Sequence, residues 1–395
     1  MHDASLITSG KNVYFQGDLP RTYENMTDRM SSGHYRLKVH PLNALQTFPP
    51  TFVLKKMGLN SFEAVKVVTA LISSAWGCCL YVLIRLIGLN RMNALILTLM
   101  GFSSSAAFFW LSVPESYGLG SISIMIGLSL AAFAQRKVIS DWGYIVISAI
   151  TLSTTVTNWM VGIFTTLSGN SIKKTINLTL ISLSLVTILW GVQKRFFPEA
   201  VFFIGDNEES SYIFFPDVER IVSVTNSFIF HTLIAPAVQT LGDNGDGWSM
   251  ISFHGALPAS ENIINVAGDV IWISIVAIGL WALFTLKEHL AFRFTLALTL
   301  IGQFFLHLLY GEETFLYSLH FLPLLIALAA LAMLTTLRMH VAIMILILIP
   351  IAATNNLMKF QTVNTTSSSP KTTLINKSHV NLSCINCTLY KLDLV

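Results

Sequence analysis

Acidic side chains beside long apolar blocks are the residues best suited to chemistry in this 395-residue sequence. Asp18 lies in the polar N-terminal segment, where its carboxylate could accept the proton of an attacking hydroxyl group. Glu24 and Asp28 follow one helical turn apart and could do the same. Charged groups near lipid are costly unless they pair or function, which makes these carboxylates candidates. The alternative is that each is a solvated residue of a turn or a helix.

Basic side chains in the same segment could hold an anion such as a phosphate. The candidates are Arg21, Arg36, Lys38 and His40. Arginine can bind a phosphate through two parallel hydrogen bonds, and lysine acts on it as a point charge. The alternative is that each of these residues contacts anionic lipid headgroups.

Three later connections between apolar blocks also carry polar residues. They contain Glu115 in Pro114-Glu115-Ser116-Tyr117, Asn158 in Thr157-Asn158-Trp159, and Glu312, Glu313, Tyr317 and His320 within 310–320. Glu312 and Glu313 could bind the hydroxyl groups of a ligand, pair with Arg21 or Arg36, or hold a divalent metal. A metal stays an open possibility, because hard cations take several oxygen ligands and one Glu pair supplies few. Glu115 and Asn158 could instead be polar helix ends, and His320 a satisfied buried histidine.

The elements that position these residues are long apolar blocks. Hydrophobic residues make up 53% of the sequence and charged residues 11%, against about 25% charged in soluble domains. About 20 apolar residues match the bilayer core, and a lone span must be helical. The blocks lie at about 65–88, 92–112, 116–134, 143–171, 176–192, 269–286, 290–310, 316–335 and 339–354. We therefore predict an all-α, polytopic membrane protein with about nine to ten membrane helices.

Basic residues alternate between the connections and so predict which side each one occupies. Lys or Arg occurs at 85–91, 136–137, 287–293 and 338, whereas the connections around 114–116 and 311–313 have none. Cytoplasmic loops carry the excess of Lys and Arg, so the first set is assigned to the cytoplasm and residues 1–60 to the outside. The net charge of +3 gives no basis for nucleic-acid binding, which needs clustered basic residues.

The block 143–171 needs a break to keep this alternation. It ends at Lys173-Lys174, and a single span would place these lysines outside. A break at Thr154–Trp159 turns the chain back and returns them to the cytoplasm, although Lys194 and Arg195 then fall outside. Unwound backbone at membrane depth is tolerated where protein or a water-filled cavity covers it. We therefore expect the break to line a cavity.

These assignments divide the chain into five parts. They are an extracytoplasmic loop with an interfacial helix near Arg21–Met30 (1–64), a first transmembrane group (65–192), an extracytoplasmic loop region (193–268), a second transmembrane group (269–354) and a polar extracytoplasmic tail (355–395). The tail carries glycosylation sequons at Asn364, Asn376, Asn381 and Asn386. Its Cys384 and Cys387 could form a disulfide or half of a zinc site.

The order of these features resembles the GT-C-type membrane glycosyltransferases. Gly17-Asp18-Leu19-Pro20-Arg21, the stretch 35–42 with His40-Pro41, and Pro49-Pro50 resemble that family's first outer loop, with its acidic residue, interfacial helix and His-Pro or Pro-Pro element. Pro114-Glu115-Ser116-Tyr117 resembles the short acidic turn between later spans, and 317–323 resembles the late span that faces the lipid carrier. The resemblance covers roughly residues 15 to 350. Family members begin with a membrane span, and this sequence has none before Asp18.

This resemblance implies transfer of a sugar from a polyprenyl-phosphate carrier to an extracytoplasmic acceptor, with inversion. It would make Asp18 the catalytic base and the carrier lipid the partner, most simply in the inner membrane of a bacterial cell. Arg21, Arg36 and His40 would contact the phosphate. The substrate cavity would be lined by Glu115, Asn158, Glu312, Glu313, Tyr317 and His320. The resemblance points to no certain cofactor, although a divalent metal is possible, and it leaves metal dependence, the sugar, the acceptor and the oligomeric state open.

Two alternatives belong to other classes of protein. A transporter or lipid flippase would need a continuous polar path with charges in the span centres, and the apolar blocks carry almost no charge there. A non-catalytic membrane subunit could derive from an enzyme that lost its first span.

Overall fold

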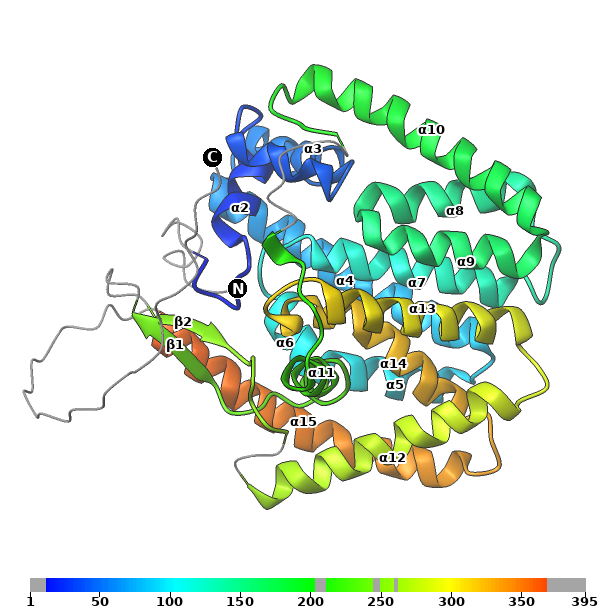
Figure 1. Cartoon of the computed structure of the whole chain (residues 1–395). Coiled ribbons are helices and arrows are strands. Elements are labelled where there is room, and N and C mark those ends of the chain that lie inside the picture. Colours follow the sequence, from blue (N-terminus) through cyan, green and yellow to red (C-terminus); the bar gives the residue numbers. More distant parts are fainter. Residues whose placement is uncertain (1–11, 203–210, 244–248, 259–261, 368–395) are drawn as a thin grey trace, which may run out of the picture.

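The chain forms a bundle of helices with a cap of short helices, loops and two strands at one end (Figure 1). The computed structural model describes residues 12–202, 211–243, 249–258 and 262–367. Six helices in this part are long and apolar enough to cross a membrane. They are α4 (Ser61–Ile87), α10 (Ile172–Phe196), α12 (Ile263–Thr285), α13 (Leu290–Leu309), η5 with α14 (Thr314–Ala332), and α15 (Arg338–Ser367). The chain is therefore a helical, multi-pass membrane protein.

Shorter helices fill the remaining apolar blocks. They are α5 (Arg91–Ser103), α6 (Ser105–Trp110), α7 (Tyr117–Phe133), α8 (Asp141–Thr154) and α9 (Trp159–Gly169). The chain bends between α5 and α6 at Ser104, whose hydroxyl accepts a hydrogen bond from the Ala107 backbone and caps the new helix. These helices lie alongside the longer ones in the bundle (Figure 1).

The predicted break in the block 143–171 is confirmed. Helix α8 ends at Thr154, Thr155 is extended, and a single 3₁₀ turn, η2 (Val156–Asn158), leads into α9. Helices α8 and α9 then pack closely side by side (Figure 1). The close approach depends on Gly162, because a Cβ there would lie 2.7 Å from the Ser148 Cα.

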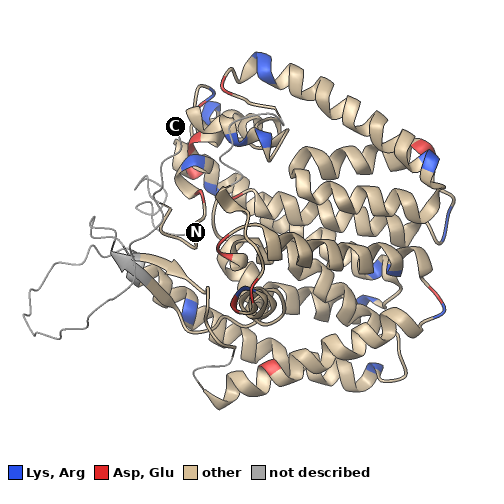
Figure 2. Cartoon of the chain, in the orientation of Figure 1, with Lys and Arg blue, Asp and Glu red and all other residues tan. Residues whose placement is uncertain are grey.

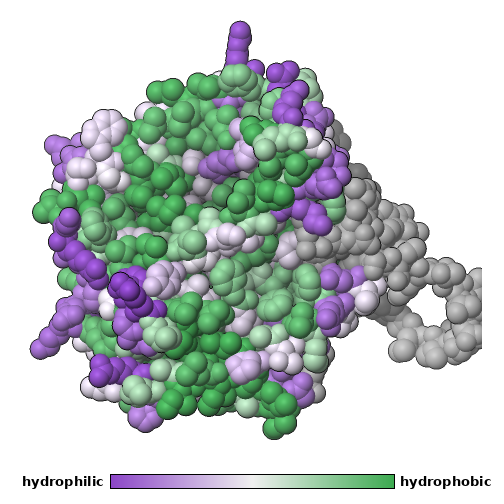
Figure 3. All heavy atoms as spheres, turned by 180° about the vertical axis from the view of Figure 1, so that it is seen from behind, coloured by the Kyte–Doolittle hydropathy of each residue, from purple (hydrophilic) through white to green (hydrophobic). Residues whose placement is uncertain are grey.

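Helix α14 (Ser318–Ala332) is the centre of the bundle. All of its 15 residues are buried, as expected of a helix that is apolar all round. Helices α4, α5, α7, α12 and α13 contact it. Many side chains of the outer helices are apolar and exposed, and the face behind that of Figure 1 is largely hydrophobic (Figure 3). This surface is suited to contact with lipid tails.

The cap lies at one end of the bundle. It consists of α2 (Leu19–Thr27), η1 (Ser32–Lys38), α3 (Asn43–Lys56), α11 (Val218–Thr225), the π-helix η4 (Asn226–His231), β1 (Gln239–Asp243) and β2 (Ser249–Ser252). The strands pair antiparallel, with Gln239 opposite Ser252. The sequence predicted one helix in the N-terminal segment and no strand anywhere, so the fold is mostly helical rather than purely so.

The connections that contain Lys or Arg lie at the opposite end of the bundle. Arg136 Nη2 donates a 3.0 Å hydrogen bond to the Leu86 carbonyl, and the His289 ring lies against Gly88. The Lys174 ammonium pairs with Asp141 at 2.5 Å, which brings the starts of α8 and α10 together. Charged residues gather mainly at the two ends of the bundle (Figure 2).

Two helices extend past the predicted boundaries, α12 from Ile263 instead of 269 and α15 to Ser367 instead of 354. Their polar residues bond inside the fold. Asn265 Nδ2 donates to Asn355 Oδ1 at 2.9 Å, and Asn356 Nδ2 donates to the Leu233 carbonyl at 2.8 Å. An amide whose hydrogen bonds are satisfied internally can continue a buried helix. The sequons at Asn376, Asn381 and Asn386 and the cysteines Cys384 and Cys387 lie outside the described residues.

The contact between α12 and α14 gives a stability prediction. A Cβ at Gly279 would lie 2.5 Å from the Leu328 carbonyl oxygen, so Gly279→Ala must push two backbones apart. We expect a loss of about 1–3 kcal/mol, the usual cost of overpacking. Gly191→Ala on α10 is the matched control, because nothing lies within 4 Å of the added Cβ. Thermal unfolding in detergent measures both, and equal stability of the two variants would contradict the contact.

Candidate functional site

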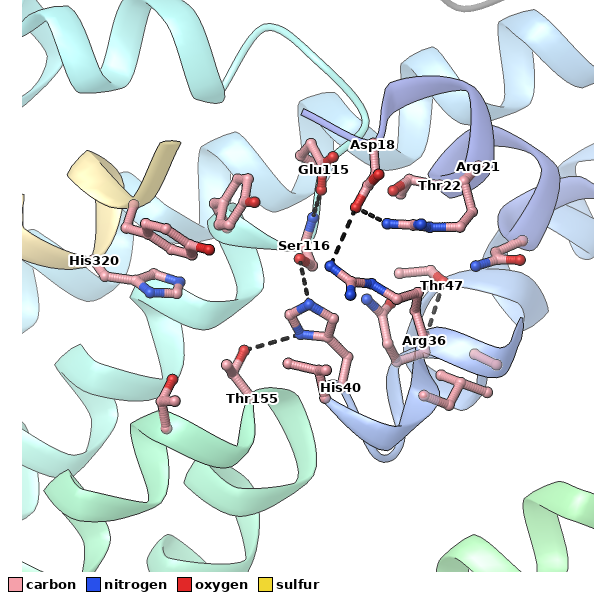
Figure 4. A pocket seen from close by; sticks show the side chains of 18 of the residues that line it. Asp18, Arg21, Thr22, Arg36, His40, Thr47, Glu115, Ser116, Thr155 and His320 are labelled. Carbon is pink, nitrogen blue, oxygen red and sulfur yellow. Dashed lines mark hydrogen bonds and ion pairs between the residues drawn. The ribbon is translucent and has the colours of Figure 1, made fainter. Parts of the chain in front are cut away.

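A pocket of about 870 Å³ lies at the capped end of the bundle. Its walls come from the N-terminal segment, the 114–117 turn, the η2 break, the end of α13 and the start of α14. The predicted site residues that line it are Asp18, Arg21, Arg36, His40, Glu115, Tyr317 and His320. His320 lies across the pocket from Asp18, Arg21 and Arg36, and Ser116 and His40 lie between them (Figure 4). The other predicted site residues, Asn158, Glu312 and Glu313, do not line it.

Asp18 directly precedes α2 and is held by two arginines. Its carboxylate forms an ion pair with Arg21 and lies 3.6 Å from Arg36 Nη2 (Figure 4). Asn12 Nδ2 donates a 2.9 Å hydrogen bond to the other oxygen. The side chains of Asp18, Arg21 and Arg36 are each 21% exposed, so this group reaches the rim of the pocket.

Tyr35, behind the rim, contacts two cations. Arg21 Nη1 donates a 3.0 Å hydrogen bond to the Tyr35 hydroxyl, and its guanidinium lies 5.5 Å from the centre of the Tyr35 ring. The Lys38 ammonium lies 5.5 Å from the same centre. Burial, followed by the charge of Arg36, lowers the pKa of Arg21. Arginine remains charged at neutral pH, so the rim concentrates positive charge.

Glu115 is a second carboxylate in a different environment. Its side chain is buried, Oε2 accepts a 2.9 Å hydrogen bond from the Ser116 backbone, and Oε1 has no hydrogen-bond partner among the described residues. Burial raises the pKa of Glu115, and the Ser116 N–H, Arg21, Arg36 and the nearby Thr22 hydroxyl offset part of the rise. One oxygen of this buried carboxyl group therefore keeps unused hydrogen-bonding capacity at the wall of the pocket.

His40 joins the cap to the bundle. Its Nδ1 lies 3.1 Å from the Thr154 carbonyl and 3.2 Å from Thr155 Oγ1, and its Nε2 lies 3.3 Å from Ser116 Oγ. Both ring nitrogens thus face protein atoms (Figure 4). The sequence predicted that His40 contacts a phosphate. Its position instead fixes the helix break against the 114–117 turn.

Aromatic and imidazole rings form the side of the pocket that lies deeper in the bundle. The ring centre of Tyr117 lies 5.9 Å from that of Tyr317 and 5.7 Å from that of His320. His307 stacks on Tyr317 at 4.3 Å. His307 was not among the predicted site residues, because it lies inside an apolar block. The sequence indicates its role only through its position four residues after Gln303, which places two polar residues on one helix face.

Asn158 lies behind the pocket wall rather than in it. It is buried and donates to the Gly120 carbonyl at 3.0 Å and to Ser123 Oγ at 3.3 Å. Gln303 Nε2 in turn donates to Asn158 Oδ1 at 3.4 Å. These bonds connect the helix break to α7 and α13, so Asn158 has a positioning role in the fold.

Glu313 lies outside this pocket and fixes the cap. Its Oε2 accepts hydrogen bonds from Ser252 Oγ at 2.5 Å and from the Phe253 and His254 backbone at 3.2 Å. Its Oε1 accepts one from the Phe315 backbone at 3.2 Å. Burial raises the pKa of Glu313, and the Ser252 hydrogen bond offsets part of the rise. The carboxyl group ties β2 to the start of η5.

Glu312 lines a neighbouring pocket of about 980 Å³ together with Glu313 and Arg220. Its Oε2 accepts a 2.8 Å hydrogen bond from Gln16 Nε2. Within the described residues, neither glutamate pairs with Arg21 or Arg36. No group of three or more His, Cys, Asp or Glu that could hold a metal ion is found in residues 12–202, 211–243, 249–258 and 262–367. The structure thus brings the two glutamates to the correct end of the bundle but not into the first pocket.

Comparison of the chain with protein-family models, with curated proteins and with solved structures finds no match. The interpretation of the site therefore rests on its own geometry.

The burial of Glu115 gives a pH-dependent prediction. Its folded-state pKa is raised above the ordinary value of 4.5, so the folded chain keeps this proton to a higher pH than the unfolded chain. Stability therefore falls as the pH rises from 4.5 through the folded-state pKa. Glu115→Gln removes this loss, and we expect its melting temperature to exceed that of the unmodified chain by a few degrees at neutral pH.

The gain should vanish in acid, where Glu115 carries a proton in both states. Glu288→Gln is the control, because Glu288 is exposed at the opposite end of the bundle. A Glu115→Gln protein that melts lower than the parent at neutral pH would mean that Arg21 and Arg36 outweigh burial.

Proposed function

We propose that this chain is a GT-C-like membrane glycosyltransferase with about nine to ten membrane helices. It transfers a sugar from a polyprenyl-phosphate carrier to an acceptor on the extracytoplasmic side of a bacterial inner membrane. The observation that carries the proposal is the pocket at the capped end, where two carboxylates, Asp18 and Glu115, adjoin a cluster of cations.

The proposed number of spans counts the shorter helices in addition to the six long ones. Helix α7 and the α5–α6 pair each run between the two ends of the bundle, and α8 and α9 form two half-length spans that meet at the break. The basic connections lie at the end opposite the cap. Their position supports a cytoplasmic location for that end.

A lipid-borne phosphate suits the location and charge of the rim. Helix α3 exposes Phe52, Val53 and Met57 and ends in Lys55 and Lys56 just before α4 begins. Apolar residues interleaved with lysines are typical of a helix that lies in the membrane interface. The rim arginines, Arg21 and Arg36, would then lie at the depth of the lipid headgroups, where the phosphate of a carrier lipid resides.

The reaction needs a base and a means of stabilising the leaving phosphate. The acceptor oxygen attacks the anomeric carbon and gives its proton to Asp18. The bond from that carbon to the phosphate oxygen breaks, and its electron pair leaves with the phosphate. Arg21 and Arg36, which line the pocket, would balance the charge that develops on the phosphate. Glu115 can take part in proton exchange, because burial raises its pKa above that of an ordinary glutamate.

Transport is a second candidate function, favoured by one observation. Thr295, Thr299, Gln303 and His307 repeat every four residues along α13 and are all buried, so a polar stripe continues from the pocket into the bundle. However, Thr295 and Thr299 bond to carbonyls of their own helix, which satisfies them without water. Flux through vesicles in the absence of any sugar transfer would favour this candidate.

The direct test is transfer of a labelled sugar from polyprenyl-phosphate donors by the purified protein. We expect Asp18→Asn to lower the rate by about 10²–10⁴-fold, the usual contribution of a general base. Glu24→Gln is the control on the same helix, where Glu24 is exposed, and it should keep full activity. An Asp18→Asn protein that melts normally and transfers sugar at the parental rate would exclude Asp18 as the base.

A further inference from the structure

The pocket has two chemically different sides. The rim is formed by α2 and η1 and carries Asp18, Arg21 and Arg36. The deeper side, which we call the floor, consists of Tyr117, His307, Tyr317 and His320 from α7, α13, η5 and α14. None of these four floor residues is Asp, Glu, Lys or Arg. A ligand that spans the pocket would therefore meet charge at one end and uncharged polar or aromatic groups at the other.

The two floor histidines have hydrogen-bonding capacity that the described residues do not use. His307 bonds to the Tyr310 backbone, while its Nδ1 has no partner in the described chain. His320 Nε2 packs against Gly120 and likewise has no partner there. Both side chains are 2% exposed. Buried polar atoms normally have partners, and those that do not call for an explanation.

Neither histidine has a charge partner. No ion pair joins His307 or His320 to a carboxylate in the described part of the chain, and a charged imidazolium buried without one would be costly. A neutral imidazole offers one donor and one acceptor. Together with two tyrosine rings, this makes a surface that suits a ligand with several hydroxyl groups and no charge.

We propose that His307, His320, Tyr117 and Tyr317 form the subsite for the sugar of the donor lipid, and that this subsite selects an uncharged sugar. The inference rests on the proposed function and adds the substrate class. The phosphate lies at the arginine rim, and the sugar extends from it onto the floor, where its hydroxyls bond to the imidazole nitrogens. A sugar that bears a carboxylate would bury that charge against four uncharged side chains, at a large desolvation cost. The nearby Arg220 guanidinium already donates to the carbonyls of His307, Leu308 and Gly311.

The test measures binding of synthetic lipids to the full chain in nanodiscs. The probes are polyprenyl phosphate itself, the same lipid bearing glucose, mannose, galactose or arabinose, and the lipid bearing glucuronate. We expect at least one neutral glycolipid to bind about tenfold more tightly than bare polyprenyl phosphate, from the added hydrogen bonds. The glucuronyl lipid should bind at least about tenfold more weakly than that neutral glycolipid.

Floor and rim variants separate the two halves of the site. His307→Phe and His320→Phe keep the ring shape but remove the nitrogens, so each should abolish the advantage of the neutral sugar and leave binding of bare polyprenyl phosphate unchanged. Arg36→Gln, at the rim, should weaken all the lipids together. Melting temperatures close to the parental value would show that the variants fold.

Different outcomes contradict different claims. Equal weakening of every lipid by the two His→Phe variants, or glucuronyl lipid that binds as tightly as the best neutral one, overturns the subsite and leaves the proposed function standing. A parent protein that binds none of the lipids overturns the proposed function and the subsite with it.

Discussion

The ion pairs of Asp18 with Arg21 and Arg36 are the interaction on which the site depends. Charges next to lipid are costly unless they are compensated, and these three residues come from the short elements α2 and η1. Their pairing joins the start of α2 to η1 and so fixes the shape of the pocket's rim. It also concentrates positive charge beside Glu115, whose burial would be harder to sustain without cations nearby.

The second constraint is that backbone N–H and C=O groups need hydrogen-bond partners. This constraint explains why the pocket lies where it does. The chain leaves the helical conformation between α8 and α9, and unwound backbone inside a membrane needs partners. His40 supplies one, because its Nδ1 lies 3.1 Å from the Thr154 carbonyl. The other side of the same ring contacts Ser116. One histidine therefore connects the break, the 114–117 turn and the cap, and the space between them is the pocket.

The sequence alone predicted the parts of this site that follow from membrane physics. Because cytoplasmic loops carry the excess of Lys and Arg, the sequence required the break at 154–159. Because the polar connections all fall on one side of the membrane, it also placed Asp18, Glu115 and His320 together. Details that depend on side-chain packing could not be predicted from the sequence. Glu312 and Glu313 were expected in the same cavity, but hydrogen bonds to Gln16 and β2 hold them in the neighbouring pocket. His307 was missed because it lies inside the apolar block 290–310, where a single histidine does not change the prediction of a membrane span.

The central claim is that the arginine rim binds the phosphate of a polyprenyl carrier. A structure of the chain in nanodiscs with a short-chain polyprenyl phosphate tests it most directly. The account predicts phosphate oxygens at hydrogen-bond distance, about 3 Å, from the guanidinium groups of Arg21 and Arg36, with the lipid tail leaving toward the membrane. Phosphate bound in the neighbouring pocket of Glu312 and Arg220, or at the opposite end of the bundle, would contradict it.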